Sequence, residues 1–175
     1  MDQHIINACK SGDLKSQKLL YEQFKVSMYV LCQRYCAGIH EAKDALQEGF
    51  IKVFRDIGQY DPSKGKFEFW VRKVFVNTCL QLLRKKKNNW VSLEDAMHLP
   101  SEDAGSAIAS LGLQELTQLI RQLPLGYRTV FNMYVIEGYS HAEIAAQLQI
   151  TESTSKTQLM KAKAMLRQKL EEALC

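Results

Sequence analysis

Apolar residues recur at intervals of three or four through most of the first 87 residues, and this helical period is the strongest constraint on the fold. The spacing predicts three helices, over residues 13–36, 38–57 and 67–87. Turn-forming residues cluster at 58–65 and predict a loop before the third helix. The whole chain has only three prolines and nine glycines, so little interrupts its helices. We therefore expect an all-α protein.

Charge divides the chain into three segments. Residues 1–87 carry 16 Lys and Arg against 9 Asp and Glu, whereas residues 88–120 carry five acids and no Lys or Arg. These acids are Glu94, Asp95, Glu102, Asp103 and Glu115. The same stretch holds Pro100, Gly105 and Gly112, a composition typical of linkers. We predict two small helical domains, residues 1–87 and 109–175, joined by an acidic linker at 88–108.

Composition narrows the class of protein. The apolar stretches are far shorter than a membrane span, and the N-terminus lacks the apolar core of a signal peptide. We therefore expect a cytoplasmic protein without membrane insertion, whose cysteines are reduced thiols. These are Cys9, Cys32, Cys36, Cys79 and Cys175. We expect neither a cofactor nor a metal.

Cations and aromatic residues alternate through the loop and into the third helix. They include Lys64, Lys66, Phe67, Phe69, Trp70, Arg72 and Lys73. Single-stranded nucleic acid is bound by such a mixture, because cations meet phosphates while rings accept unstacked bases. An ordinary domain, with the aromatics in its core and the lysines on a solvated face, would give the same pattern.

The C-terminal segment has the pattern of a helix-turn-helix. Ser140 and Glu143 form a predicted capping box, which starts a short helix. A tight turn at 149–151 leads into a longer helix from about residue 152 to 170. Its cations are Lys156, Lys161, Lys163, Arg167 and Lys169. A basic second helix suits the major groove of DNA, although a helical hairpin with a solvated basic face remains the alternative.

Residues 14–170 together resemble a bacterial RNA polymerase sigma factor of the extracytoplasmic-function (ECF) class. The family's core-binding helix is similar to DALQEGFIKVF, and its −10-reading helix to KFEFWVRKVFVNTCLQLLRKKK. Its −35-reading domain is similar to LPLGYRTVFNMYVIEGYSHAEIAAQLQIT followed by STSKTQLMKAKAML. The resemblance implies a non-enzymatic transcription initiation factor that binds core RNA polymerase, recognises −35 and −10 promoter elements and assists strand opening.

The resemblance also implies site residues. Asp44, Gln47 and Glu48 would dock on the coiled coil of the polymerase β′ clamp, and the β flap is a second expected contact. The 59–66 loop would receive a base flipped out of the −10 element. The residues expected along the −10 DNA are Lys64, Lys66, Trp70, Arg72, Lys73, Asn77 and Arg84. Those expected at the −35 element are Glu152, Ser153, Lys156, Thr157 and Lys161.

Two further expectations follow from the family. The acidic linker would run through the RNA exit path of the polymerase, which is lined for polyanions. ECF factors are commonly held by an anti-sigma factor, and the sequence names none for this chain.

Three residues depart from the family pattern. Gln81 stands where Asp is usual, so a local salt bridge would be missing. Gln149 stands where the turn often has Gly, which would strain the backbone at a positive φ. Ser155 stands where Val is common, and its small size would allow close helix packing.

Alternatives from other classes remain. A stand-alone helix-turn-helix regulator would bind promoter DNA without core polymerase and would not need Asp44, Gln47 and Glu48. An enzyme is disfavoured, because no catalytic set is evident and the four histidines, His4, His40, His98 and His141, are scattered. A redox or metal sensor would use Cys32 and Cys36, one helical turn apart, but no further ligands lie near them in the sequence.

Overall fold

The chain divides into two compact units, Met1–Met97 and His98–Cys175. The computed structural model describes residues 1–89 and 111–174, with side chains for 1–85 and 115–171. Every regular element in these ranges is helical, as predicted. The boundary between the units falls inside the predicted linker at 88–108, nearly all of which lies outside the described residues. The linker's role and the domain limits therefore stay predictions.

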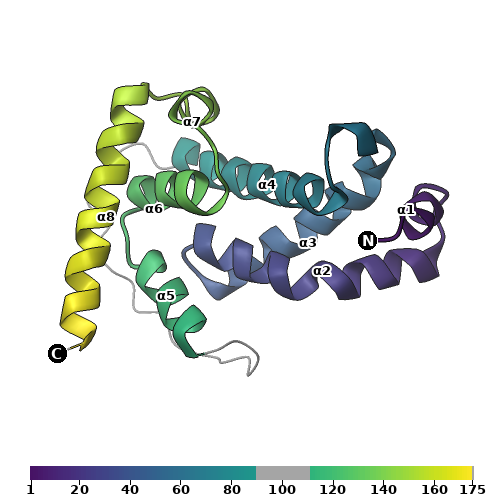
Figure 1. Ribbon diagram of the computed structural model, residues 1–175, viewed down its shortest axis with the longest axis horizontal. Helices are drawn as coiled ribbons and strands as arrows, with labels where there is room; N and C mark the ends of the chain where they lie inside the picture. Colours follow the sequence, from purple (N-terminus) through teal and green to yellow (C-terminus); the bar gives the residue numbers. More distant parts are fainter. Residues whose placement is uncertain (90–110, 175) are drawn as a thin grey trace. The chain divides into compact units, whose positions relative to one another are not determined.

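Three long helices form the first unit: α2 (Leu14–Tyr35), α3 (Ile39–Asp56) and α4 (Phe67–Asn89) (Figure 1). Each packs against the other two. Their shared core includes Leu20, Met28, Leu31, Ala42, Ala45, Val53, Val71, Phe75 and Val76. Each helix thus turns one apolar stripe inward, and a fully buried side chain of this size contributes about 1.5–3 kcal/mol. The three helices predicted from the spacing of apolar residues are thus confirmed.

The first unit also contains a helix that the sequence did not predict, α1 (Gln3–Lys10). It is only eight residues long, and its buried side chains are Ile6 and Cys9. Such a short segment shows no recurrent period, and an isolated helix of this length is unstable in water. Packing against α2 and the start of the loop after α3 therefore holds it in place.

The second unit begins with α5 (Leu111–Arg121) and α6 (Leu125–Phe131), and α6 continues into a π-helical turn, η3 (Asn132–Ile136). Then follow α7 (His141–Leu148) and α8 (Glu152–Leu174). A buried cluster of Ile120, Leu123, Ala162 and Leu166 joins the α5 end of this unit to α8. The Arg128 side chain donates from Nη1 to the Arg121 carbonyl over 2.9 Å, which satisfies an acceptor at the C-terminus of α5.

The cysteines whose side chains the structure describes are buried and form no disulfide: Cys9, Cys32, Cys36 and Cys79. The Sγ atoms of Cys32 and Cys79 lie 4.0 Å apart across α2 and α4. Burial raises the pKa of the Cys9 thiol, and the charge of Asp13 adds to this. Within the described side chains, no group of three metal-ligating residues comes together.

Within the described residues, no helix is at once long enough and hydrophobic enough to cross a lipid bilayer.

Candidate protein and nucleic-acid interfaces

The outer side of α3 presents the three residues predicted to bind a protein partner. Asp44 and Gln47 are exposed, and Glu48 is half-buried. Lys52, one turn further on, places its Nζ 3.4 Å from the Glu48 carboxylate. The same Nζ donates to Gln81 Oε1 on α4 over 2.8 Å. Gln81 therefore keeps a contact by hydrogen bond where an Asp would form a salt bridge.

Ile51 is an apolar member of this surface that the sequence analysis did not single out. Its side chain is 53% exposed, although it is large and hydrophobic. It follows Asp44 by seven residues and Gln47 by four, so at about 100° per residue the three share one face of the helix. We call Asp44, Gln47, Glu48 and Ile51 the α3 face. An exposed apolar residue ringed by polar groups is the arrangement found at the centre of protein interfaces.

The 59–66 loop is held by its own side chains. Asp61 Oδ1 accepts hydrogen bonds from the backbone N–H of Ser63 over 2.9 Å and from its hydroxyl over 2.7 Å. These bonds, followed by the nearby positive charge of Lys64, lower the pKa of Asp61. Gly65 has φ 138°, a conformation that favours glycine. The loop thus forms two short 3₁₀ turns, η1 (Ile57–Gln59) and η2 (Pro62–Lys64).

The lysines of this loop extend away from it. The Lys64 side chain is 83% exposed and lies 3.9 Å from the Asp61 carboxylate. Lys66 is also exposed. Exposed ion pairs at such a distance are weak, so the Lys64 charge remains available to a polyanion.

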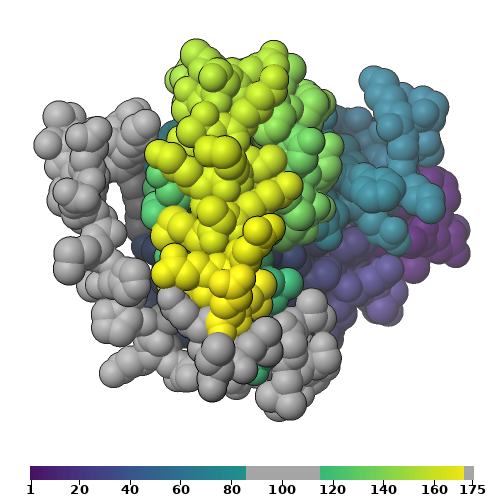
Figure 2. Space-filling model, turned by 60° about the vertical axis from the view of Figure 1, so that its left-hand side comes forward, coloured from purple at the N-terminus to yellow at the C-terminus, as the bar shows by residue number. Residues whose placement is uncertain are grey.

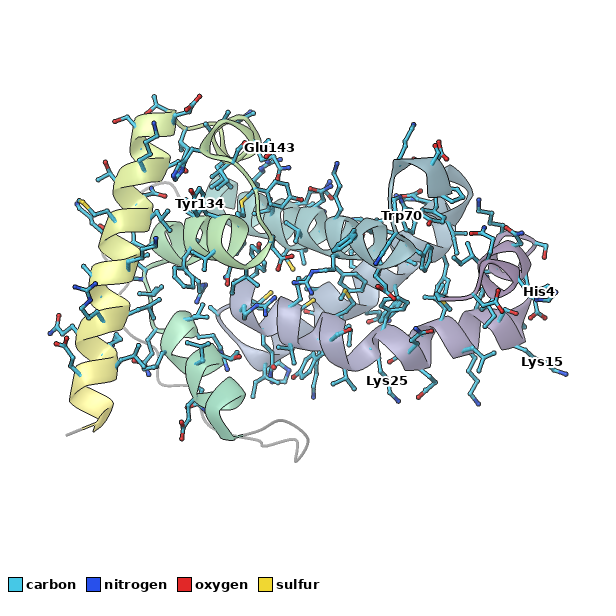
Figure 3. The ribbon with its side chains drawn as sticks, in the orientation of Figure 1. His4, Lys15, Lys25, Trp70, Tyr134 and Glu143 are labelled. Atoms are coloured by element: carbon cyan, nitrogen blue, oxygen red, sulfur yellow. The ribbon has the colours of Figure 1, made fainter. Side chains whose placement is uncertain are left out.

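The aromatic residues beside the loop fall into two classes. Tyr60, Phe67 and Trp70 pack together, with ring centroids 5.0 to 6.0 Å apart. Figure 3 shows Trp70 on α4 near the loop, and its ring is half-buried by these contacts. Phe69 is different, because 65% of it is exposed. Trp70, which was predicted to lie along the −10 DNA, is thus partly covered by neighbouring rings, whereas the Phe69 ring is mostly uncovered.

Further along α4, the predicted cations do not all share one side. Lys73, Asn77 and Arg84 are exposed and follow one another at four and seven residues, so they line one face together with Trp70. We call Lys73, Asn77 and Arg84 the α4 face. Arg72 points elsewhere and lines a cleft of about 270 Å³ between α2 and α4. The other residues of the cleft are Gln23, Phe24, Ser27, Met28 and Glu68.

The short helix and turn of the second unit form as predicted. The Ser140 hydroxyl accepts from the Glu143 backbone N–H over 3.2 Å, and Glu143 Oε2 accepts from the Ser140 backbone N–H over 2.8 Å. Figure 3 shows Glu143 on α7. The helix ends at Gln149, whose φ is 55°. The φ of Gln149 is thus positive, the condition under which this departure from glycine would strain the backbone, and it lets the chain turn directly into α8.

A polar contact crosses between the two helices of this motif. Ser155 is buried on α8, and its Oγ lies 2.9 Å from Nδ1 of His141 on α7. The His141 ring in turn stacks on Tyr134, with centroids 4.4 Å apart. Ser155 therefore does more than leave space: it forms a hydrogen bond that Val could not form.

The inner side of α8 is apolar, and its outer side is polar. Ser155, Leu159, Ala162 and Leu166 are buried. Figure 2 shows α8 at the surface of its unit, with the outer side uncovered along much of its length.

Four of the five predicted −35 residues are on the uncovered side of α8. Ser153 and Thr157 are exposed one turn apart, and with about 100° per residue they mark the middle of this side. Lys156 and Lys161 are exposed on either flank of that line, whereas Glu152 lies nearer the buried edge. Lys161 Nζ also lies 6.0 Å from the centroid of the Tyr127 ring.

Met160 was not singled out by the sequence analysis, although 64% of it is exposed on the same side. We call Ser153, Lys156, Thr157, Met160 and Lys161 the α8 outer face.

The second unit also has an apolar pocket of about 360 Å³. It is lined by Leu116, Phe131, Lys163, Leu166, Arg167, Leu170 and Glu171. Leu116 and Leu170 are more than 40% exposed. Lys163 and Arg167 thus border this pocket, so the cations of α8 do not all serve one surface.

Two family models match the chain, one in each compact unit. The chain matches the model of Sigma-70 region 2 over residues 20–89 and that of Sigma-70, region 4 over residues 113–166. It is 30% identical over 184 residues to the ECF RNA polymerase sigma factor SigW of Bacillus subtilis, covering 94% of both chains. It is 26% identical to the RNA polymerase sigma-H factor of Pseudomonas aeruginosa, covering 99% of this chain and 95% of that one.

Two solved structures have a similar fold. One is CnrH in complex with the cytosolic domain of CnrY, with a TM-score of 0.54 and 19% identity, covering 98% of this chain and 97% of that one. The other is the sigma factor RpoE in complex with the anti-sigma factor NepR from Bartonella quintana, with a TM-score of 0.56 and 17% identity. This match covers 90% of this chain and 98% of that one. At these identities the likeness concerns the fold. The family models and the sequence relatives identify the chain as a member of the ECF RNA polymerase sigma factors.

Proposed function

We propose that this sigma factor binds core RNA polymerase through the α3 face, reads the −35 element with α8 and opens the −10 element with the 59–66 loop and α4. The observation that carries the proposal is the α3 face. A stand-alone DNA-binding regulator has no use for an exposed isoleucine ringed by carboxylate and carboxamide groups. The protein acts in the cytoplasm by binding alone, without covalent chemistry.

The α3 face suits a basic helical surface such as the predicted β′ coiled coil. Asp44 and Glu48 offer negative charge, and Gln47 offers both a donor and an acceptor. Ile51 supplies the apolar contact that is buried when the partner docks. Lys52 restrains the Glu48 carboxylate before binding, which lowers the conformational entropy lost on docking.

The apolar pocket of the second unit is our candidate for the second core contact, with the β flap. Leu116 and Leu170 leave apolar surface uncovered, while Lys163, Arg167 and Glu171 form a charged border. An apolar helix or loop tip inserted between α5 and α8 would bury these leucines.

At the −10 element, Lys64 and Lys66 would hold the phosphates beside a flipped base. Flipping a base costs a few kcal/mol, which stacking and phosphate contacts must offset. Phe69 is suited to the stacking, and the α4 face to the adjoining strand or duplex edge. Arg72, at the α2–α4 cleft, belongs to this site only if the strand continues past that cleft.

At the −35 element, different residues of α8 would contact the bases and the phosphates. Ser153 and Thr157 would face the base edges from the middle of the outer side, with Glu152 at the helix start. Lys156 and Lys161 would meet phosphates on opposite walls of the groove. Met160 would offer apolar contact, of the kind that suits a thymine methyl group.

Control by an anti-sigma factor is also part of the proposal. The two similar structures are both complexes, one with the cytosolic domain of CnrY and one with the anti-sigma factor NepR. We propose that this chain too is held inactive by a protein that covers surfaces needed for core polymerase or DNA.

The test is the affinity of purified protein for core polymerase. Replacing Gln47 and Glu48 with Ala, or Ile51 with Ala, should weaken binding by about 2 kcal/mol or more, the size of an interface hot spot. A matched control replaces Glu22 and Gln23, an exposed carboxylate and carboxamide on α2. Wild-type affinity in both α3 variants, or equal loss in the control, would contradict this assignment of the docking surface.

A further inference from the structure

The loop proposed to capture the flipped base is tied to a helix outside the family's promoter-reading segments. We propose that Lys10, at the end of α1, is a positioning residue for base capture: it fixes the 59–66 loop from behind without contacting DNA. The inference rests on the proposed function of that loop, and it names a determinant of strand opening fifty residues away in the sequence.

The tie is a direct contact. Lys10 Nζ donates to the backbone carbonyl of Tyr60 over 3.0 Å. The same Nζ lies 5.8 Å from the centroid of the Tyr60 ring, within range of a cation–π contact. The α1 helix that carries Lys10 packs against η1, the first turn of the loop (Figure 1).

Tyr60 is the residue through which this contact would control the loop. Its hydroxyl donates to the Gly65 carbonyl over 3.0 Å, which closes the loop on itself. Its backbone N–H donates to the Ile57 carbonyl over 3.2 Å. Its ring packs against Phe67 and Trp70 and is nearly buried. Lys10 satisfies the remaining polar group, the Tyr60 carbonyl.

Lys10 differs from Lys64 and Lys66 in the contacts of its ammonium group. All three lysines are exposed, but Lys64 and Lys66 extend from the loop, whereas the Lys10 ammonium is hydrogen-bonded to the Tyr60 carbonyl. The pKa of Asp61 is lowered mainly by hydrogen bonds from Ser63, and the charges of Lys64 and Lys10 add to this. Lys10 thus supports both the carbonyl and the carboxylate that shape the loop.

This arrangement also gives α1 a role. An eight-residue helix is maintained only by its packing, and the Ile6 and Cys9 side chains anchor it to the unit. Because α1 is anchored, the hydrogen bond from Lys10 can restrain the loop.

The experiment compares Lys10→Met with Lys10→Arg in holoenzyme assembled with core polymerase. Methionine keeps an unbranched apolar side chain but removes the donor and the charge, whereas arginine keeps both. Lys15→Met, on the exposed start of α2, removes one charge without touching the loop. Open-complex formation is followed by permanganate footprinting, and core affinity and the melting temperature of the protein are measured alongside.

We expect Lys10→Met to reduce strand opening about tenfold, the effect of losing one hydrogen bond from a charged donor. Core affinity and melting temperature should stay close to wild type, Lys10→Arg should restore most of the opening, and Lys15→Met should open normally. On a promoter with a pre-opened −10 region, holoenzyme that contains Lys10→Met should discriminate less between the captured base and other bases at that position.

Three results would overturn the inference: normal opening by Lys10→Met, equal loss by Lys15→Met, or loss of core affinity and melting temperature in parallel with opening. Replacing Lys64 and Lys66 with Ala separates this outcome from failure of the proposed function. If the loop variant is defective and Lys10→Met is not, only the role of Lys10 fails. If the loop variant opens DNA normally, the proposed base capture fails and the inference fails with it.

Discussion

Single residues decide how closely the helices of the first unit approach. Gly49 lies inside α3, where glycine costs about 1 kcal/mol relative to alanine. A Cβ at this position would overlap the ring of Phe75, which is fully buried on α4. The glycine thus allows α4, which carries the side chains proposed to face the promoter, to lie directly against α3.

Gly49→Ala should therefore destabilise the protein despite the better helix propensity of alanine. Overpacking a core costs about 1–3 kcal/mol and the better propensity returns about 1 kcal/mol, so we expect a net loss of up to about 2 kcal/mol in the free energy of unfolding. Denaturant unfolding would measure it, with Gly58→Ala as the control, because no atom lies within 4 Å of a Cβ there. Combining Gly49→Ala with Phe75→Leu should cost less than the sum of the two changes. Equal stability of Gly49→Ala and wild type would show that the ring yields without cost.

Phe69 is the residue at which structure most changes the expectation for base stacking. Phe69→Ala should leave the unfolding free energy near wild type, because the side chain is mostly exposed. It should weaken binding of single-stranded −10 DNA by holoenzyme by about 1–3 kcal/mol, the range for one base–aromatic stack. Leu19→Ala removes an equally exposed apolar side chain from α2 and should have no such effect. Unchanged DNA affinity in Phe69→Ala would return the stacking role to Trp70.

Among the helices, the features that depend on the local sequence pattern were predictable. The stripes of α2, α3 and α4 follow from apolar spacing, and the start of α7 follows from Ser140 and Glu143. Contacts made between distant segments were not predictable in this way. Ile51 and Phe69 are large apolar side chains, and only the three-dimensional packing shows that nothing covers them. The short α1 likewise depends on tertiary contacts, not on its own period.

The two classes of residue on α8 should behave differently in DNA binding. Lys156→Ala should weaken binding to all −35 variants alike and reduce the salt slope by about one, because one fewer phosphate is neutralised. Thr157→Ala should change the preferred base at one position by about 1–3 kcal/mol and leave the salt slope nearly fixed. Holoenzyme binding to single-base variants at several salt concentrations distinguishes the two. Uniform weakening by Thr157→Ala, or an altered preferred base in Lys156→Ala, would mean that another side of α8 enters the groove.

At the scale of the whole molecule, the account requires two DNA-reading units that work only when core polymerase holds both. The α3 face and the apolar pocket provide one candidate core contact in each unit. Neither unit contains a described metal cluster, and the chemistry proposed for both is recognition. A stand-alone regulator would need only the second unit for its activity.

Run-off transcription with purified core polymerase on genomic fragments measures whether the protein directs core polymerase to promoters. Wild-type protein should produce discrete transcripts that core polymerase alone does not make. The Gln47 and Glu48 double alanine variant should lose most of this activity, whereas the Glu22 and Gln23 control should keep it. The account is contradicted if no fragment yields a transcript although the protein alone binds those fragments with sequence preference, because that is the behaviour of a stand-alone regulator.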